Sequence, residues 1–274
     1  MRFGLDVAQQ RLPWDELVRR AQLAEELGFD GVWGFDHFQP MFGEGVGETF
    51  EGMTFLAALA SVTTRVRLGL LVAGMTYRHP SVYAAQALTI DHASHGRLEM
   101  SFGAAWYDKE HTELGIPFPP TGERFDLLED ALEITTRLFT GEVVDYEGKR
   151  VSLRQAQLQP PPVQRPHPPI WIGGSGPKRT LPLVAKYADV WHSFGTPNSM
   201  RDAYERIDQL AEQGGRDPKS ILRAGSISLD DIETSKKHAG KWRDAGYGYL
   251  VCGWPGAGAS QVEAFAREVM PDFV

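Results

Sequence analysis

The sequence predicts an α/β fold of the TIM (β/α)8 barrel type, with insertions after strand 4 and before strand 5. Short β-rich apolar runs alternate with longer segments of helical periodicity from one end of the chain to the other. Eight such pairs can be counted, and eight parallel βα units close into a barrel. The length of 274 residues falls within the range of one such barrel. We therefore interpret residues 1–274 as a single barrel domain.

The expected barrel strands are short apolar runs bounded by turn residues. In chain order they are Phe3 to Val7, Gly31 to Phe35, Arg67 to Val72, Arg97 to Phe102, Ile170 to Gly173, Asp189 to Phe194, Ile221 to Ile227 and Tyr249 to Cys252. The helices between them carry apolar residues every three or four positions, as over residues 14–24 and 125–139. Gly28 and Gly141 follow these two segments and are typical of helix C-termini.

Two segments exceed a minimal barrel. Residues 104–121, rich in aromatic residues and prolines, form a long excursion after strand 4, where lids over active sites often lie. Residues 142–169 precede strand 5 and contain an expected hairpin over 143–151, turning at Glu147 and Gly148, and then a proline-rich stretch. We interpret both as insertions on the barrel.

Composition limits the partners and the location of the protein. A net charge of −8 argues against nucleic acid or an anionic membrane as the main partner, because both require basic surface. The single cysteine, Cys252, excludes an internal disulfide and is typical of a reducing compartment. The N-terminus lacks a signal-peptide pattern, so we expect a cytoplasmic protein. His92 and His95 have no carboxylate-rich motif beside them, so no metal site is expected.

A glycine-rich turn after strand 5 indicates a ligand site. It consists of Gly173, Gly174, Ser175 and Gly176. Such a turn lets a phosphate lie against main-chain N–H groups, and the helix expected over Leu181 to Tyr187 would add its N-terminus. The same pattern also arises from packing alone. The GxGxxG fingerprint of a dinucleotide-binding domain is absent.

In a barrel, the loops at the C-terminal ends of the strands carry the chemistry. Asp36 and His37 follow strand 2, and an imidazole can donate a hydrogen bond or move a proton near neutral pH. A satisfied surface pair is the alternative interpretation. After strand 3, an apolar run that could face a flat ring is followed by basic residues. After strand 4, Gly103 to Trp106 combine small residues with an indole that can wall a ring.

Six segments of the chain form a recognisable set in the order Gly28 to Phe38, Thr76 to Pro80, Gly96 to Leu98, Gly103 to Trp106, Gly115 to Phe125 and Pro169 to Lys178. Together they resemble the bacterial luciferase-like oxidoreductases, and most closely the branch that uses the deazaflavin coenzyme F420. The resemblance covers nearly the whole chain. It implies a modified TIM barrel, often a homodimer, that binds the tricyclic ring across the C-terminal mouth of the barrel.

The resemblance also implies roles for individual residues. Asp36 and His37 match a pair beside the reactive edge of the deazaflavin, with His37 as proton donor or as hydrogen-bond stabiliser of the reduced ring. Leu71 and Val72 match a non-prolyl cis peptide behind the ring. The other residues implied in cofactor binding are Gly74, Gly103, Ala104, Ala105, Trp106, Gly173, Gly174, Ser175, Gly176 and Lys178. Lys178 and its neighbour Arg179 would meet the phosphate or the acidic tail of the coenzyme, unless they are solvated surface charges.

The function that the resemblance implies is hydride transfer between F420 and an unidentified small-molecule acceptor. An FMN-dependent monooxygenase of the same superfamily and a non-catalytic deazaflavin carrier are the alternatives. Trp106 stands where the sugar-phosphate dehydrogenase branch has a glutamate thought to act as general acid, and Met41 replaces an aromatic residue. Sugar-phosphate oxidation is therefore not expected. Phe38, Met41, Trp106, Tyr107 and His192 indicate an apolar, aromatic-lined acceptor pocket.

Overall fold

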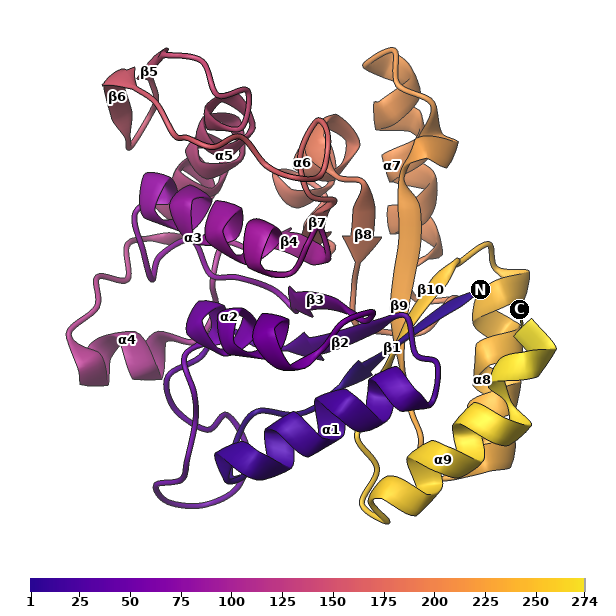
Figure 1. Ribbon diagram of the computed structural model, residues 1–274. Helices are drawn as coiled ribbons and strands as arrows, with labels where there is room; N and C mark the ends of the chain where they lie inside the picture. Colours follow the sequence, from indigo (N-terminus) through magenta and orange to yellow (C-terminus); the bar gives the residue numbers. More distant parts are fainter. Residues whose placement is uncertain (274) are drawn as a thin grey trace.

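A closed barrel of parallel strands forms the centre of the computed structural model, which describes residues 1–273 (Figure 1). The barrel strands are β1 (Arg2–Asp6), β2 (Gly31–Gly34), β3 (Arg67–Leu70), β4 (Leu98–Phe102), β7 (Ile170–Gly173), β8 (Val190–His192), β9 (Leu222–Ser228) and β10 (Tyr249–Gly253). They follow one another around the barrel in chain order, and β10 pairs with β1 to close it. The TIM barrel predicted from the sequence is confirmed. Val274, the last residue of the predicted domain, lies outside the described residues.

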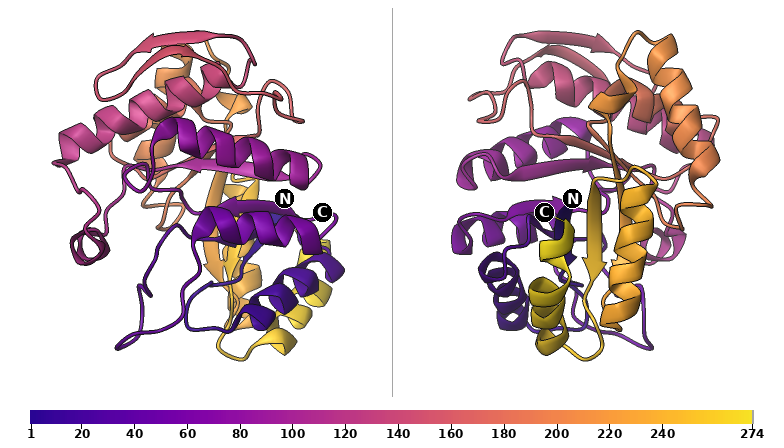
Figure 2. Two further views of the ribbon diagram at one scale, coloured as in Figure 1. Left: turned by 60° about the vertical axis from the view of Figure 1, so that its left-hand side comes forward. Right: turned by 90° about the vertical axis from the view of Figure 1, so that its right-hand side faces the viewer.

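Helices cover the outside of the barrel, and at least one follows each strand (Figure 2). They are α1 (Trp14–Glu26), α2 (Gly52–Val62), α3 (Pro80–Ala93), α4 (Asp108–Leu114), α5 (Thr121–Leu138), α6 (Thr180–Tyr187), α7 (Arg201–Gln213), α8 (Ile232–Asp244) and α9 (Ala259–Glu268). Two 3-10 helices span Pro218–Ser220 and Met270–Phe273. The N-terminal amino group donates a hydrogen bond of 2.6 Å to the carbonyl of Phe273, so the chain ends beside its beginning.

Both insertions lie where the sequence places them. The first contains α4, and the second is the hairpin β5 (Val144–Glu147) and β6 (Ser152–Ala156). The turn predicted at Glu147 and Gly148 lies instead over residues 148–151, because Glu147 still pairs with Ser152. Asp130 of α5 accepts the N–H groups of residues 149–151 at 2.6 to 3.0 Å. The position of the turn is therefore set by a distant carboxylate, which local sequence does not reveal.

Four strands end earlier than predicted, and the first of them, expected to reach Val7, ends at Asp6. The strand expected from Asp189 to Phe194 spans only Val190–His192, and Phe194 is 72% exposed. The strand expected to reach Val72 ends at Leu70, because the chain leaves the barrel there and turns toward β4. The strand expected to reach Phe35 ends at Gly34. The predicted strands are too long because the apolar sequence continues beyond the last paired residue of each strand.

Aromatic side chains fill the inside of the barrel. Trp33, Trp171 and Tyr249 pack with ring centroids 4.2 to 5.9 Å apart. The indole N–H of Trp33 donates to the Tyr249 hydroxyl at 3.0 Å. Gly4 and Gly69 face these rings, and a Cβ atom at either position would overlap the Trp33 side chain. The interior is thus a packed plug, and ligands can enter only above it, at the mouth.

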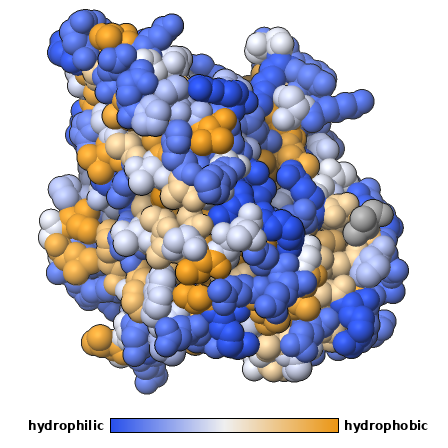
Figure 3. Space-filling view, in the orientation of Figure 1, coloured by the Kyte–Doolittle hydropathy of each residue, from blue (hydrophilic) through white to orange (hydrophobic). Residues whose placement is uncertain are grey.

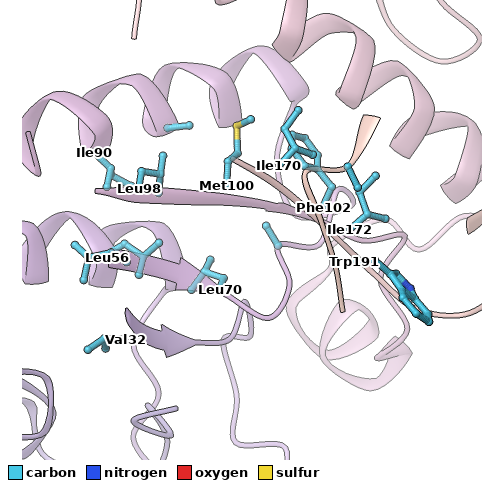
Figure 4. Packing of buried hydrophobic residues seen from close by; sticks show 14 of the residues in the cluster. Val32, Leu56, Leu70, Ile90, Leu98, Met100, Phe102, Ile170, Ile172 and Trp191 are labelled. Carbon is cyan, nitrogen blue, oxygen red and sulfur yellow. The ribbon is translucent and has the colours of Figure 1, made fainter. Parts of the chain in front are cut away.

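The larger apolar core lies between the barrel and the surrounding helices. Figure 4 shows Leu98 and Met100 of β4 pointing toward α3, which contributes the buried Ile90. Because the strands of a parallel barrel are covered on both faces, they read as continuous apolar runs, which is the pattern that revealed them in the sequence.

Candidate active site

His37 lies at the C-terminal end of β2 and is held by a carboxylate from the first insertion. Its Nδ1 is 2.5 Å from Oε1 of Glu110, which is fully buried on α4. The other carboxylate oxygen accepts the N–H groups of Phe38 at 2.8 Å and Gln39 at 3.3 Å. The Tyr77 hydroxyl donates to Oε1 as well. The insertion therefore does more than cover the barrel, because it fixes the orientation of the imidazole.

The electrostatics of this cluster determine which nitrogen of His37 is free. Burial alone would raise the pKa of Glu110, but hydrogen bonds from His37, Tyr77 and the Phe38 N–H hold it below its ordinary value. An ionised carboxylate only accepts hydrogen bonds, so Nδ1 of His37 carries a proton. Among residues 1–273, no group forms a hydrogen bond with Nε2 of His37. That atom accepts a proton when the ring is neutral and donates one when the ring is charged.

Aromatic rings surround His37. The rings of Tyr77, Trp106 and Tyr107 have centroids 5.5 to 6.2 Å from the imidazole, all in edge-to-face orientation. His37 itself is 9% exposed, whereas Trp106 is 67% exposed. A largely exposed indole beside a buried imidazole provides apolar surface that a ligand could cover.

Asp36 points away from His37 and binds a different partner. Its two oxygens accept hydrogen bonds from the two terminal nitrogens of Arg78, at 2.6 and 2.7 Å. Oδ2 also accepts a hydrogen bond from the N–H of Gly74 at 2.8 Å. Arg78 reaches on to Glu51 at 2.8 Å, and Glu51 caps the N-terminus of α2. The carboxylate beside the imidazole is therefore Glu110, and Asp36 instead anchors the loop after β3.

That loop forms a bulge across the barrel mouth. The peptide bond between Leu71 and Val72 is cis, as the resemblance implies. The Val72 side chain lies against Gly103 and Gly173, where added Cβ atoms would come within 2.6 and 3.0 Å of it. Gly74 forms an isolated bridge with Gly103, joining the loops after β3 and β4. The structure thus brings together residues that the sequence places in three separate loops.

The loop after β4 continues from this bulge. Ala104 is half-buried, and Ala105 adopts a left-handed conformation with φ of +57°. The small side chain limits crowding in this uncommon conformation, which turns the chain toward Trp106 and α4. The three residues lie on the same side of the mouth as His37, since Trp106 contacts it.

The glycine-rich turn after β7 is exposed. Gly174 has φ of +108°, which favours glycine, and its N–H donates to the His192 carbonyl at 3.0 Å. This N–H group is therefore occupied. The N–H groups of Ser175 and Gly176, which lie shortly before the start of α6, have no hydrogen-bond partner within residues 1–273. This helix begins at Thr180, one residue before the predicted start.

The two basic residues after the turn differ in their contacts. Arg179 binds Asp126 of α5 at 2.7 Å and approaches Glu129 at 3.5 Å, so its charge is already paired. Lys178 is exposed and forms no ion pair in the described part of the chain. Of the two residues expected to meet an anionic ligand, only Lys178 is therefore free to do so.

Sequence reasoning missed Glu110 and Tyr77 as members of this site. Tyr77 stands within the motif that follows β3, but nothing in the sequence shows that its hydroxyl meets a helix 33 residues further on. Glu110 lies within the predicted lid segment, and the adjacent His111 also turns inward, its Nε2 lying 2.7 Å from the Thr76 hydroxyl. Fully buried polar side chains in an insertion are the structural signal that was not visible in the sequence.

Two negative findings concern the chain as far as it is described. Residues 1–273 contain no cluster of three His, Cys, Asp or Glu side chains arranged to hold a metal ion. Over the same residues, no helix is both long and apolar enough to cross a membrane.

The chain is similar in sequence to several curated proteins. An F420-dependent glucose-6-phosphate dehydrogenase of Microbacterium testaceum is 37% identical over 181 residues, which are 66% of this chain and 53% of that enzyme. The chain thus spans about half the length of this curated relative. An enzyme of the same description from Nakamurella multipartita is 34% identical over 88% of this chain and 72% of its own length. An uncharacterized protein of Mycobacterium tuberculosis is 28% identical over 81% of this chain and 75% of its own.

Solved structures share the fold. An F420-dependent secondary alcohol dehydrogenase in complex with an F420-acetone adduct aligns with a TM-score of 0.89 at 18% identity, covering 100% of this chain and 99% of that one. The F420-dependent tetrahydromethanopterin reductase of Methanopyrus kandleri aligns with a TM-score of 0.85 over the same shares, also at 18% identity. The family model for luciferase-like monooxygenases matches residues 1–251. The chain therefore belongs to the luciferase-like monooxygenase family.

Proposed function

We propose that the protein is an F420-dependent oxidoreductase that transfers hydride between the deazaflavin and a small-molecule acceptor. The observation that carries the proposal is the cradle formed by Val72, Gly103 and Gly173 beside His37, in which Cβ atoms on the glycines would crowd Val72. A flat ring fits over such a bulge because no side chain rises from the glycines. The names of the sequence relatives support F420 as the cofactor.

Different residues of the chain would bind the coenzyme, hold the proton and cover the site. When bound, F420 supplies the carbon that gives or receives hydride. Val72 supports one face of the ring, and the free N–H groups of Ser175 and Gly176 hold the phosphate, with Lys178 beside them. His37, anchored through Nδ1 by Glu110, holds or moves a proton at Nε2. Trp106 covers the site and excludes water from it.

The acceptor differs from glucose 6-phosphate. A sugar phosphate needs basic groups for its phosphate, and Trp106 stands where the sugar-phosphate dehydrogenase branch has a glutamate thought to act as general acid. The rings of Tyr77, Trp106 and Tyr107 instead line an apolar approach to His37. We propose an apolar or aromatic acceptor, in a cytoplasmic enzyme whose single cysteine, Cys252, is free and buried.

The cofactor is tested by binding titrations of the purified protein. We expect fluorescence titrations with F420, FMN and NADPH in parallel to show the tightest binding for F420. Affinity for F420 should weaken as salt rises, because Lys178 and the exposed turn attract an anion through solvent. FMN binding as tight as F420 binding at physiological salt would reject the assignment and favour a flavin monooxygenase.

A substitution in the glycine-rich turn tests the phosphate site. Gly174→Val should lower F420 affinity roughly 10- to 150-fold, about 1.5 to 3 kcal/mol, because a β-branched residue is strained at φ of +108° and shifts the neighbouring N–H groups. Gly215→Val is a matched control, since Gly215 also has positive φ, at +74°, and lies away from the mouth after α7. Equal affinity in both variants would leave the turn with a packing role.

We further propose a homodimer, formed through the groove between α2 and α3. Its volume is about 460 Å³, and its walls include Met53, Ala57 and the half-exposed Val82. Figure 3 shows apolar residues gathered over these two helices. The Ser81 hydroxyl and the Gln86 side-chain carbonyl beside this groove have no hydrogen-bond partner within residues 1–273.

Light scattering tests the dimer. We expect wild-type protein to have twice the mass of one chain and Val82→Glu to shift toward the monomer, because a charge in an apolar interface is costly to bury. Val143→Glu is the matched control, since Val143 is exposed to a similar degree in the second insertion. A monomeric wild-type protein, or a dimer that survives Val82→Glu unchanged, would contradict this interface.

A further inference from the structure

A second polar group lies in the barrel mouth, on strand β1. Gly4 points into the barrel, because a Cβ atom there would meet the side chains of Trp33 and Tyr249. Side chains alternate along a strand, so Asp6, two residues further, also points inward, at the C-terminal end of β1. Asp6 is in register with Trp33 of β2 and Gly253 of β10. Its carboxyl group therefore lies above the aromatic plug, on the floor of the mouth.

Two further polar side chains share this floor. Val190 and Ala224 belong to the cluster inside the barrel, so His192 and Ser226, two residues beyond each, point inward at the same end. Nε2 of His192 is 2.9 Å from the Ser226 hydroxyl. Burial lowers the pKa of His192 to about 4, so its imidazole is neutral at physiological pH. Asp6 is then the acidic group on this part of the floor.

Asp6 has no cation to balance it. Its Oδ1 accepts the N–H of Ala8 at 2.9 Å, and it forms no ion pair among residues 1–273. The charge that faces it from outside the barrel is Arg20 of α1, whose guanidinium binds Glu16 at 2.8 Å and the Val7 carbonyl at 3.1 Å. Burial raises the pKa of Asp6 to about 6, against weaker lowering by the Ala8 N–H and by Arg20.

The other carboxylates near the mouth already have charged or hydrogen-bonding partners. Asp36 is bound by Arg78, and Glu110 is bound by His37 and Tyr77. Glu99 lies deeper, where it accepts the indole N–H of Trp171 at 2.6 Å and pairs with Arg67. Asp6 is partly exposed and lies at a strand end, so a ligand above the plug can reach it.

We propose that Asp6 is the general acid and base that exchanges a proton with the acceptor, a catalytic role that rests on the proposed hydride transfer. In the reducing direction, a C–H bond of the reduced deazaflavin breaks and its hydride forms a C–H bond on a carbonyl carbon of the acceptor. The O–H bond of the Asp6 carboxyl breaks at the same time, and its proton forms an O–H bond on the carbonyl oxygen. Solvent then restores the proton to Asp6 and takes up the proton from the ring nitrogen of the coenzyme, which leaves in its oxidised form.

This role accounts for the absence of a glutamate at position 106. A proton must reach the acceptor for net reduction, and Trp106 cannot supply one. Asp6 lies at the end of β1, and His192 and Ser226 lie near the ends of β8 and β9. The acceptor would therefore lie over these strands. The cradle of Val72, Gly103 and Gly173 lies at the ends of β3, β4 and β7, and β7 is the neighbour of β8, so the acceptor would lie beside the ring.

The first test is the titration of Asp6 in the protein without cofactor. Protein labelled with carbon-13 at aspartate carboxyl groups is titrated by NMR, and the Asp6 signal is assigned by its loss in Asp6→Asn. A midpoint near 6 is expected. A midpoint below about 4.5 overturns the proposal, whatever the cofactor, because such a carboxyl is ionised across the working range.

The second test uses benzaldehyde, an apolar aromatic acceptor whose reduction needs a hydride on the carbonyl carbon and a proton on the carbonyl oxygen. Single-turnover oxidation of bound reduced F420 should slow about tenfold per pH unit above pH 6 in the wild type, because protonated Asp6 becomes scarce. Asp6→Asn should be roughly 10²-fold slower at pH 5.5 and lose this pH dependence, whereas Asp6→Glu should retain part of it.

The exposed Asp15→Asn variant on α1 is the control and should match the wild type. An unchanged pH profile in Asp6→Asn that still binds F420 overturns the proposal. Loss of F420 binding in the wild type would instead overturn the proposed function, and the NMR midpoint separates the two outcomes. Melting curves of Asp6→Asn and Asp6→Glu show whether either variant is unfolded, and one folded variant suffices for the comparison.

Discussion

His37→Ala is expected to slow single-turnover hydride transfer between bound F420 and benzaldehyde by roughly 10²- to 10⁴-fold, the range of general acid–base catalysis. The imidazole is held at Nδ1 by Glu110 at 2.5 Å, while Nε2 is free to meet the ring or the acceptor. Alanine removes that atom and leaves Glu110 with Tyr77 and two main-chain N–H groups as donors. The affinity for F420 should fall much less than the rate, since other loops hold the coenzyme.

Stopped-flow oxidation of the prereduced complex measures the rate, and a fluorescence titration measures the affinity. His238→Ala, on the exposed face of α8, is the matched control and should change neither quantity. A His37→Ala variant that transfers hydride at the wild-type rate would remove the catalytic role and leave His37 as a wall of the pocket. Equal losses of rate and affinity would indicate a binding role instead.

The barrel was predictable because each of its strands is covered on both faces. Apolar runs such as Ile170–Ile172 must then be continuous, and the helices between them must carry one apolar face, so both patterns are visible locally. That Gly103 and Gly173 lie at the same end of the barrel was predictable for a related reason, since Gly103 directly follows β4 and Gly173 ends β7. In a barrel, all C-terminal strand ends lie at one mouth.

The partners of the site residues were not predictable in the same way. Asp36 and His37 are adjacent in sequence, yet their side chains leave the strand end in opposite senses and bind Arg78 and Glu110, 42 and 73 residues away. Which of several carboxylates meets a given cation depends on how a loop or insertion folds back. Asp6 lies within the strand predicted over Phe3 to Val7, and the sequence does not show how deeply the aromatic side chains fill the barrel beneath it.

Glu110→Gln tests the contact that sequence reasoning missed. The variant keeps the size of the side chain, but an amide nitrogen replaces one of the two accepting oxygens. Either the donors at Oε1, His37 and Tyr77, or the main-chain N–H donors at Oε2 then lose their acceptor. We expect the free energy of unfolding to fall by about 1 to 3 kcal/mol at pH 7, the cost of an unsatisfied buried group. Hydride transfer should slow roughly 10- to 100-fold, because the imidazole is no longer oriented.

The pH dependence of this difference identifies the charge of Glu110 as its cause. The pKa of Glu110 in the folded protein is lower than its ordinary value of 4.5, so ionisation stabilises the fold above that pH. The stability gap between wild type and Glu110→Gln should therefore be full at pH 7 and shrink as the pH falls below 4.5. Tyr77→Phe is the control, since it removes one donor while the carboxylate and His37 stay, and it should cost less in both stability and rate. A gap that stays constant from pH 7 to pH 3.5 would show that packing of the side chain, and not its charge, holds His37 in place.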